Sequence, residues 1–212
     1  MKKNIIYAFI LVLFSATNIS AQNNPQAEKI LSDLLLSAKT SAIKTNFKLA
    51  TNDKNTSQAV ATGTFTLKGN KFVLDMDDMK VWFDGKTQWA YNQQNNEVSI
   101  TEPTEKELSD TNPMAILSAY KAKCLIKFSN KTKSAQNHCI EMTPKVKNKD
   151  IAKIEVQVNK TNANLFSIKL INTNGSTSLL TVNNFQNGLK VADNFFVFNQ
   201  SKYKGISVND LR

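Results

Sequence analysis

This chain has few of the side chains that most often carry catalysis or hold a metal. Its 212 residues include one histidine, one arginine and two cysteines. The histidine, His138, has no ligand-spaced partner beyond its neighbour Cys139, and adjacent residues of a strand point to opposite faces. A Cys-His or Ser-His-Asp arrangement is therefore not expected. The sequence predicts no catalytic residues, no metal site and no cofactor.

Two further shortages argue against other functions. With Arg212 as its one arginine, the chain lacks the planar groups that read bases and clamp phosphates, so we expect no nucleic-acid partner. The six glycines are scattered and form no glycine-rich phosphate loop. Acidic residues cluster at Asp75, Asp77 and Asp78, but they lie beside a turn and are interpreted as a solvated rim.

Long apolar runs are also missing, apart from one near the start of the chain. Lys2 and Lys3 precede ten apolar residues at 5–14, and the small residue Ala21 follows. This is the layout of a secretory signal peptide cleaved near Ala21. A retained membrane anchor is the alternative, but such a run is about half of a membrane span. We expect a signal peptide at 1–21, no lipidated cysteine after it, and one soluble exported domain at 22–212.

Positive charge is present but unevenly distributed. Residues 22–120 carry 10 Lys against 12 Asp and Glu, whereas residues 121–160 carry 10 Lys against 3 acidic residues. We interpret the basic region as a solvated surface that keeps the protein soluble. The alternative is a surface that approaches anionic lipid headgroups or a membrane partner.

Short alternating segments are abundant between residues 63 and 100. The turns between them hold Gly, Asn and Asp, which tolerate the backbone conformations of hairpin connections. The pattern predicts four or five successive antiparallel strands. Their apolar faces hold Phe65, Leu67, Phe72, Leu74, Met76, Trp89, Tyr91, Val98 and Ile100.

Two helices are predicted to begin with an Asn-Pro pair, in which Asn is the N-cap and Pro takes the first helical position. One covers 25–38 and carries Ile30 and Leu34 on its apolar face. The other covers 113–120, with Met114, Leu117 and Tyr120 in a short apolar stripe. The polar connection before it holds one helical turn around 105–108. Further strands are predicted at 154–158, 166–170, 178–185 and 195–198.

The two cysteines flank a predicted hairpin of strands at 125–128 and 140–143. In an exported protein a disulfide between Cys124 and Cys139 is the default expectation. One detail disagrees, because Cys124 shares a strand face with Ile126 whereas Cys139 shares one with Glu141. A bulge or a loose register would be needed to reconcile the two faces.

These elements predict a mainly β (α+β) domain of ten or eleven antiparallel strands. A sheet of that length curls, and the two helices are available to cover its apolar concave face. If the helices fill the concavity, it is an ordinary core. If they leave it partly open, it is a pocket for an apolar ligand. The residue pattern leaves both possibilities open.

Three motifs together point to a known family. The segment GTFTLKGNKF at 63–72 is followed by DGKTQWAYN at 84–92 and by NPMAIL at 112–117. In this order they closely resemble the periplasmic lipoprotein carriers called LolA. The ending resembles them too, because FVF at 196–198 precedes GISVND at 205–210, like the family's final strand and tail. The likeness covers essentially the whole mature chain, and the combination is more specific than any one motif.

The resemblance implies an incompletely closed β-barrel with a helical lid over a hydrophobic cavity. In that family the cavity shields the acyl chains of lipoproteins, which come from an inner-membrane ABC transporter complex and pass to an outer-membrane receptor. We expect this chain to act as a monomeric carrier with acylated lipoproteins as partners. The expected cavity and lid residues are Ile30, Leu34, Phe65, Phe72, Leu74, Met76, Trp89, Tyr91, Ile100, Met114, Ile116, Leu117, Phe166 and Ile168.

One position departs from the family pattern. Well-studied members carry an arginine just before the strand that here holds Phe72, and it tethers the lid to the sheet. Lys68 stands nearest to that place and is the candidate tether, although an ammonium group cannot reproduce a planar multi-donor contact. Two alternatives remain beside the lipoprotein carrier: a carrier of other lipids, and a protein-binding or scaffold module of the same fold with a filled core.

Overall fold

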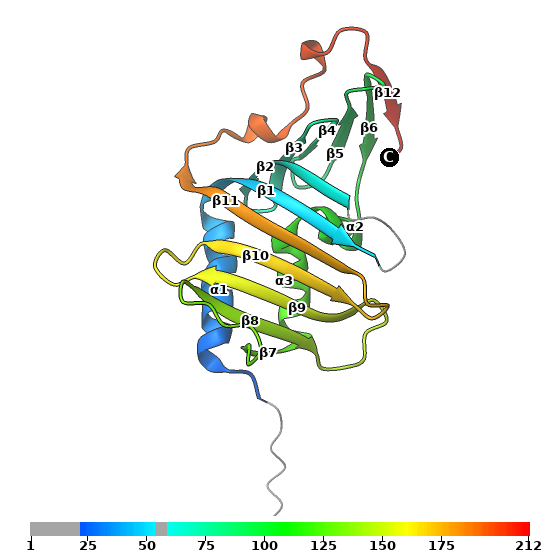
Figure 1. Ribbon diagram of the computed structural model, residues 1–212. Helices are drawn as coiled ribbons and strands as arrows, with labels where there is room; N and C mark the ends of the chain where they lie inside the picture. The colour runs from blue at the N-terminus through cyan, green and yellow to red at the C-terminus, as the bar shows by residue number, and fades with distance from the viewer. Residues whose placement is uncertain (1–21, 54–58) are drawn as a thin grey trace, which may run out of the picture.

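One curved sheet organises the molecule, with helices packed against its inner side (Figure 1). The computed structural model describes residues 22–53 and 59–212, so the predicted signal peptide lies outside the described residues. Within them the sheet has twelve strands in the order β12-β6-β5-β4-β3-β2-β1-β11-β10-β9-β8-β7. The strands are β1 (Ala42–Asn52), β2 (Ala59–Lys68), β3 (Lys71–Met76), β4 (Met79–Phe83), β5 (Gln88–Asn92), β6 (Glu97–Thr101), β7 (Cys124–Phe128), β8 (Asn137–Pro144), β9 (Ile151–Asn159), β10 (Leu165–Asn172), β11 (Thr177–Leu189) and β12 (Ser207–Asp210).

The sheet is an incomplete barrel. All pairings between the described strands are antiparallel except that of β12 with β6, which is parallel. Strand β1 pairs with both β2 and β11 and so joins the two halves of the sheet. Strands β7 and β12 stand at the two ends of the order, so the curve does not close.

The alternation of β1 illustrates how the sequence gives the sheet two unlike faces. Ile43 and Phe47 are buried, whereas Lys44 and Lys48 are exposed. Successive side chains of a strand point to opposite faces, so Ile43, Phe47 and Leu49 turn to the concave side. The neighbouring strands alternate in the same way, because residues that pair across two strands lie on the same face of the sheet.

Helix α1 (Pro25–Thr40) crosses the concave face. It begins at Asn24, whose side-chain oxygen accepts a hydrogen bond from the Ala27 N–H at 3.0 Å. The Asn24 N–H donates to the Ile126 carbonyl at 2.8 Å, and this bond attaches the start of the helix to β7. Farther along, α1 contacts β1 and β2. Its buried face holds Ala27, Leu31, Leu34, Leu35 and Ala38.

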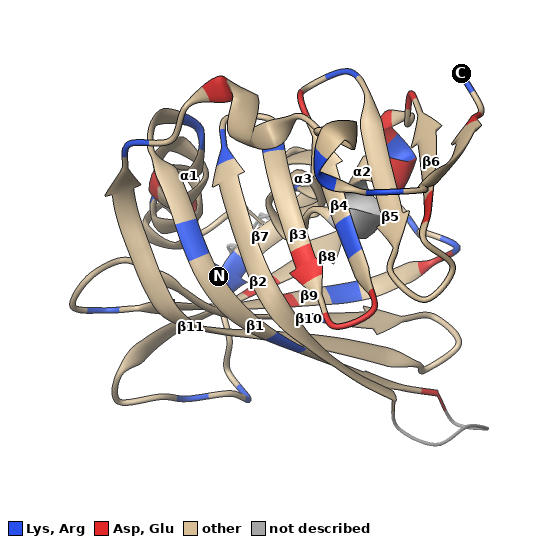
Figure 2. Cartoon of the chain, turned by 90° about the horizontal axis from the view of Figure 1, so that it is seen from above, with Lys and Arg blue, Asp and Glu red and all other residues tan. Residues whose placement is uncertain are grey.

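Two shorter helices follow β6 and lie on the same side as α1. Helix α2 (Glu105–Thr111) starts with a capping box between Thr104 and Glu107, and α3 (Pro113–Lys121) is capped by Asn112. Seen from above, α1, α2 and α3 lie within the curve of the sheet (Figure 2). None of the helices in the described part of the chain is both long enough and apolar enough to pass through a membrane.

The apolar side chains form two clusters, one on each face. The first lies between the concave face and the helices, and it includes Leu31, Phe72, Leu117 and Ile168. The second lies on the convex face, where Val73 and Trp82 pack with Phe196 from the end of the chain. A stretch with two short 3-10 helices, η1 (Asp193–Phe196) and η2 (Gln200–Lys202), covers that second cluster.

Most predicted elements are confirmed, with instructive differences. The helices at 25–38 and 113–120 and the strands at 154–158, 166–170 and 178–185 lie where α1, α3, β9, β10 and β11 are found. The predicted strand at 195–198 is wrong, because η1 occupies its start and the segment packs as a cover on the sheet. Strand β1 has no counterpart among the predicted segments, although it alternates clearly, and β4 is one of five strands in the region where four or five were predicted.

Candidate functional site

The concave face is closely packed at one end and only half-buried at the other. A cross-strand row of Ile43, Leu67, Phe72 and Phe83 is between 0% and 5% exposed. This row adjoins the β2–β3 turn, where Gly69 lies near the carbonyl of Lys39 in α1. Farther along the same face Phe65 and Val81 are still buried, whereas Leu49, Leu74, Met76 and Ala90 are only half-buried. The described residues therefore present apolar side chains to solvent at the end away from that turn.

The helices contribute half-buried apolar side chains to the same cluster. These are Ile30 of α1, Leu108 of α2 and Met114 of α3. Methionine is unbranched and adapts to irregular surroundings, so Met76 and Met114 can pack against apolar groups of varied shape. The concave face thus offers apolar contacts from both the sheet and the helices.

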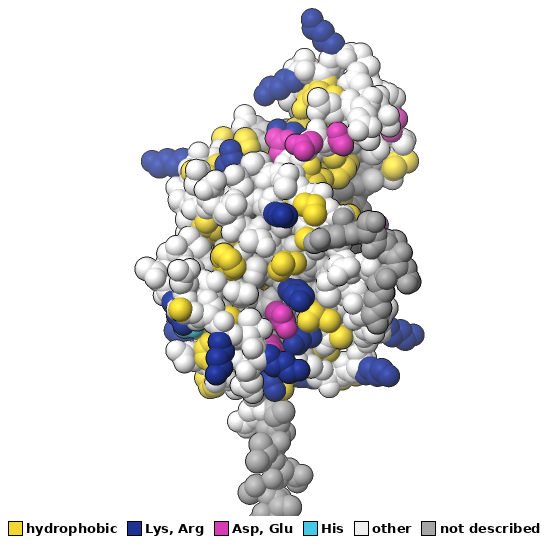
Figure 3. Space-filling view, in the orientation of Figure 1, with side chains coloured by type: hydrophobic (Ala, Val, Ile, Leu, Met, Phe, Trp, Pro, Cys, Tyr) yellow, Lys and Arg dark blue, Asp and Glu magenta, His cyan; other side chains and the backbone are white. Residues whose placement is uncertain are grey.

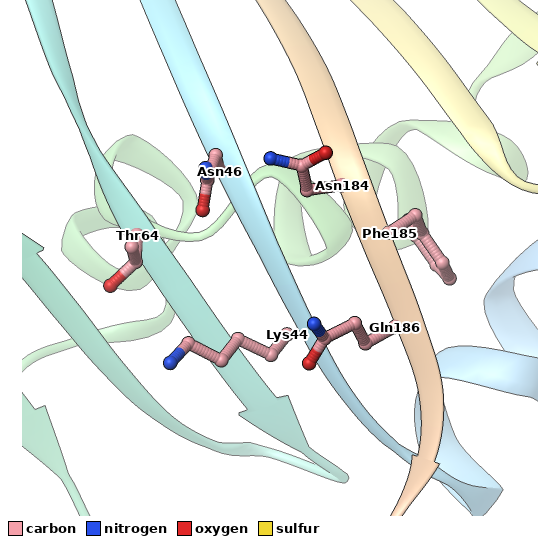
Figure 4. Close-up of a pocket in the computed structure, with 6 residues that line it drawn as sticks. All are labelled: Lys44, Asn46, Thr64, Asn184, Phe185 and Gln186. Carbon is pink, nitrogen blue, oxygen red and sulfur yellow. The ribbon is translucent and has the colours of Figure 1, made fainter.

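The convex face holds a separate set of pockets beneath the C-terminal segment, defined here as residues 190–203. The largest has a volume of about 1010 Å³ and lies between this segment and the sheet from β1 to β4. A smaller pocket of about 400 Å³ lies beside it over β1 and β11, where Lys44, Asn46 and Asn184 present polar groups (Figure 4). Elsewhere on this face the apolar side chains are scattered among polar ones (Figure 3).

The C-terminal segment is held to the sheet by ion pairs as well as by packing. The Lys68 ammonium donates to the Val191 carbonyl at 2.9 Å, and Lys68 and Lys71 each lie 2.8 Å from a carboxylate oxygen of Asp193. Hydrogen bonds from Lys68 and then from Lys71 lower the pKa of the Asp193 carboxyl to about 2. The carboxylate is therefore ionised at any ordinary pH, and the two ion pairs persist.

A family model described as outer membrane lipoprotein carrier protein LolA matches residues 18–174. The chain belongs to the LolA family. The match covers most of the strands and all three helices over the concave face of the described chain. Members of this family are described as carriers, so the family points to binding rather than to catalysis.

Comparisons with individual proteins show which solved structures have a similar fold. The comparison with curated proteins gave no match. Among solved structures, an uncharacterized conserved protein from Thermus thermophilus is similar at 10% identity, with a TM-score of 0.57 over 87% of this chain and 99% of that chain. A LolA superfamily protein from Nitrosomonas europaea has 11% identity and a TM-score of 0.43, covering 81% of this chain and 97% of its own. At such identity the Thermus likeness shows the fold alone.

Most of the residues expected to line the LolA-type cavity lie on the concave side. The buried ones are Leu34, Phe65, Phe72, Ile116, Leu117 and Ile168, and the half-buried ones are Ile30, Leu74, Met76 and Met114. Phe72 stands at the centre, with its ring 5.6 Å from that of Phe65 and 5.4 Å from that of Phe83. The structure thus brings together residues from three strands, β2, β3 and β10, and from two helices, α1 and α3.

Three of the expected cavity residues are on the other face. Trp89 and Tyr91 belong to the second cluster and pack toward the C-terminal segment. Ile100 pairs directly with Trp89 and so shares its face. The prediction that these three line the acyl cavity is wrong, because the alternation of β5 turns Ala90 inward instead. A meander that is apolar on both faces does not reveal which face the helices cover.

Phe166 is the fourth misplaced residue. The pairing of β10 with β9 shifts between Leu165 and Ser167, so β10 has one extra residue at this point. Such a bulge reverses the face of the side chains beyond it. Phe166 is therefore 42% exposed, whereas Leu165 and Ile168 on either side are buried.

The expected role of Lys68 as a tether for the helical lid is also wrong. Its side chain lies on the convex face, and its bonds go to Val191 and Asp193 in the C-terminal segment. It does tether a covering element to the sheet, but that element is the segment at the end of the chain. The difference follows from the face on which position 68 falls, one residue after the inward-facing Leu67.

The predicted disulfide is wrong as well. Cys124 pairs with Pro144 at one end of the β7–β8 hairpin, whereas the Cys139 carbonyl accepts from the Ser129 N–H at the turn end. Five residues of strand separate the two levels, or roughly 16 Å, far beyond the ~7 Å that a disulfide can span between Cα atoms. Both cysteines are free and buried, and burial raises the pKa of each thiol.

Several concave-face residues were missed by the sequence reasoning. Ile43, Phe47 and Leu49 of β1 and Val81 and Phe83 of β4 belong to the first cluster or pack against it. The signal was available in β1, where these apolar residues alternate with Lys44, Asn46 and Lys48. In β4 the run Val81-Trp82-Phe83 is continuously apolar because both faces of that strand are covered.

Proposed function

We propose that this chain is a periplasmic carrier that binds the acyl chains of lipoproteins on the concave face of its incomplete barrel. In this proposal it takes the lipoprotein from an inner-membrane ABC transporter complex and releases it toward the outer membrane. It acts as a monomer and performs no catalysis. The proposed path requires the export that the basic and apolar pattern of residues 1–21 predicts.

The observation that carries the proposal is the fall in burial along the concave face. Phe72 is fully buried at the closely packed end, whereas Leu74 and Met76 of the same strand are half-buried. Single half-buried apolar residues are ordinary at the edge of a core, but Leu49, Leu74 and Met76 gather on the same face of nearby strands, as apolar residues of an interaction surface do. Half-buried Leu49 and Met114 give an acyl chain apolar contacts from the sheet and from α3.

The free energy of burial limits how the acyl chains can be bound. Either the chains are buried incompletely, or a free-energy cost elsewhere in the protein offsets their burial. Each buried methylene contributes about 0.8 kcal/mol, so three long chains would contribute on the order of 30 kcal/mol. Non-covalent affinity has a ceiling near ~18–21 kcal/mol, and cargo held that tightly would not leave. Separation of α1 and α3 when cargo enters provides the offset, because it gives up packing between the helices and the sheet.

The test uses purified residues 22–212 and a neutral apolar dye, N-phenyl-1-naphthylamine. A triacylated lipopeptide should displace the dye, and the same peptide without its chains should not. Binding of neither dye nor lipopeptide would overturn the carrier proposal. Release of lipoprotein from spheroplasts is the second readout, since a carrier should release it and a binding module should not.

A second experiment tests the separation of the helices. A cysteine pair across the α1–α3 contact, in a background with Cys124→Ala and Cys139→Ala, would lock the helices when oxidised. The oxidised protein should not take up the lipopeptide, and reduction should restore uptake. Equal uptake in both forms would reject the moving lid while leaving the acyl site itself intact.

A protein-binding module with a filled core is the second candidate. It is favoured by the complete burial of Phe72, Leu31 and Leu117, which pack as an ordinary hydrophobic core packs. Such a module would not bind the lipopeptide through its acyl chains, so the lipopeptide would displace no dye. The first experiment therefore separates the two candidates directly.

A further inference from the structure

The pocket on the convex face has the surface of a ligand site. Val73 and Trp82 form part of its floor and are 4% and 7% exposed. The ring of Phe198 lies 5.3 Å from that of Trp82, and Phe198 in turn stacks on Tyr203 at 5.0 Å. The C-terminal segment and the sheet thus enclose a space of about 1010 Å³ that has aromatic walls.

The charged residues that line this pocket are all basic, although Asp75 and Asp193 lie beside it. Four lysines and no acidic residue line it. Lys80 is paired with Asp75 at 2.5 Å, but Lys44, Lys190 and Lys202 are exposed and have no ion-pair partner among the described residues. Clefts lined by one sign of charge concentrate ligands of the opposite sign. The unpaired ammonium groups are therefore available to an anion.

The neighbouring pockets extend the same surface. The pocket of about 400 Å³ shares Lys44 with the large one, and another of about 310 Å³ shares Lys80 and Tyr203 with it. In Figure 4 the Lys44 side chain extends from β1 toward β2.

We propose that the convex pocket is a second ligand site, which binds a small anionic amphiphile. The apolar ring or short chain of the ligand lies against Trp82 and Phe198, and its acid group contacts Lys190 and Lys202. Because this site is on the opposite face of the sheet from α1 and α3, it binds independently of cargo on the concave face. Nothing in the proposal depends on the carrier function.

The test compares two dyes with the same ring system. The sulfonate 8-anilinonaphthalene-1-sulfonate should bind residues 22–212 with a component that the triacylated lipopeptide does not displace. The double variant Lys190→Glu, Lys202→Glu should weaken this component at least tenfold. The uncharged N-phenyl-1-naphthylamine should bind the same variant as it binds the wild type. The control variant Lys131→Glu, Lys133→Glu changes two exposed lysines that do not line the pocket. It should leave binding of both dyes unchanged.

Three outcomes would overturn the proposal. One is unchanged sulfonate binding in the Lys190 and Lys202 variant, provided that its circular dichroism matches the wild type. Another is complete displacement of the sulfonate dye by the lipopeptide, which would place the dye on the concave face. The third is binding of an acidic peptide but not of the dye, with the same lysine dependence, which would make the surface a peptide site.

Discussion

At the scale of single residues, position within the strand period decides what a side chain does. Phe72 and Val73 are neighbours in β3, yet Phe72 packs under the helices and Val73 packs under the C-terminal segment. The two phenylalanines Phe72 and Phe166 differ still more, because the first is fully buried and the second is 42% exposed at a bulge.

Replacement of these two phenylalanines should therefore have unequal effects. Phe72→Ala should lower the free energy of unfolding by about 3–5 kcal/mol, because it leaves a cavity among Phe65 and Phe83. Phe166→Ala is the matched control and should cost less than about 1 kcal/mol. Urea unfolding measures both values. Equal losses would mean that Phe166 is buried in solution and that the bulge is misplaced.

A second residue-scale prediction concerns Gly63. A Cβ at this position would lie 2.2 Å from the Asp75 carbonyl oxygen on the neighbouring strand. Since backbone cannot yield as a side-chain tip does, Gly63→Ala should push β2 from β3 and cost about 1–3 kcal/mol or more.

The control for Gly63 is Gly188, where a Cβ would meet nothing within 4 Å but φ is +72°. Gly188→Ala should cost only the strain of the left-handed backbone, about 1 kcal/mol. Thermal unfolding of the two variants compares them. A larger loss at Gly188 than at Gly63 would contradict the close approach of β2 and β3.

At the scale of elements, the two covers of the sheet are attached by different means. Helix α1 is anchored by one backbone hydrogen bond, from its cap residue Asn24 to β7, and by a buried apolar face. The C-terminal segment is anchored by Phe196, which is fully buried, and by the ion pairs of Asp193 with Lys68 and Lys71. The ion pairs are solvent-exposed, so they position the segment more than they stabilise the fold.

Asp193→Asn should loosen the C-terminal segment without unfolding the sheet. Hydrogen exchange of the amides at 191–197 should become faster in the variant, and the unfolding midpoint should change little. Asp33→Asn, which removes an exposed ion pair with Lys29 in α1, is the control and should not alter exchange at 191–197.

The same contact predicts a pH dependence. Because the folded-state pKa of Asp193 is lowered to about 2, its stabilising effect is complete above the ordinary pKa near 3.8 and is lost as pH falls through about 2. Exchange at 191–197 in the wild type should therefore begin to accelerate, beyond the intrinsic effect of acid, as pH falls below about 3.8, and the acceleration should be complete only near pH 2. An acceleration that is already complete at pH 4 would show that the carboxylate is not held by the two lysines.

At the scale of the whole molecule, one sheet connects both hydrophobic clusters. The strands that carry Phe72 and Phe83 inward carry Val73 and Trp82 outward. The two clusters therefore share β3 and β4, and neither can be lost without disturbing the other. A domain of this kind usually unfolds as one cooperative unit.

Unfolding should accordingly be coincident by two probes. The chain has two tryptophans, Trp82 and Trp89, and both belong to the convex cluster. Their fluorescence reports that face, whereas far-ultraviolet circular dichroism at the helix band reports the helices on the concave face. The two urea midpoints should agree. An earlier midpoint for fluorescence would mean that the C-terminal segment and its cluster unfold separately.

Helix starts and strand alternation could be predicted from the sequence, whereas an irregularity in strand pairing could not. The caps at Asn24 and Asn112 placed the starts of two helices, because an Asn-Pro pair satisfies the local requirements of a helix start. The alternation in β3 correctly grouped Phe72, Leu74 and Met76 on one face. In β10 the alternation misled at Phe166, since an extra residue in one strand leaves no local mark in composition.

The sequence by itself determined most of the strands and turns, the starts of α1 and α3, and the family to which the chain belongs, because these depend on local backbone preferences and on motifs in order. Only the tertiary structure decided which face each strand presents to the helices. Trp89, Tyr91 and Ile100 are as apolar as the true concave residues, and they turn outward because the C-terminal segment covers the other side. The tertiary structure also decided that Cys124 and Cys139 stay free. The register of the β7–β8 hairpin sets the distance between the two residues, and composition does not reveal that register.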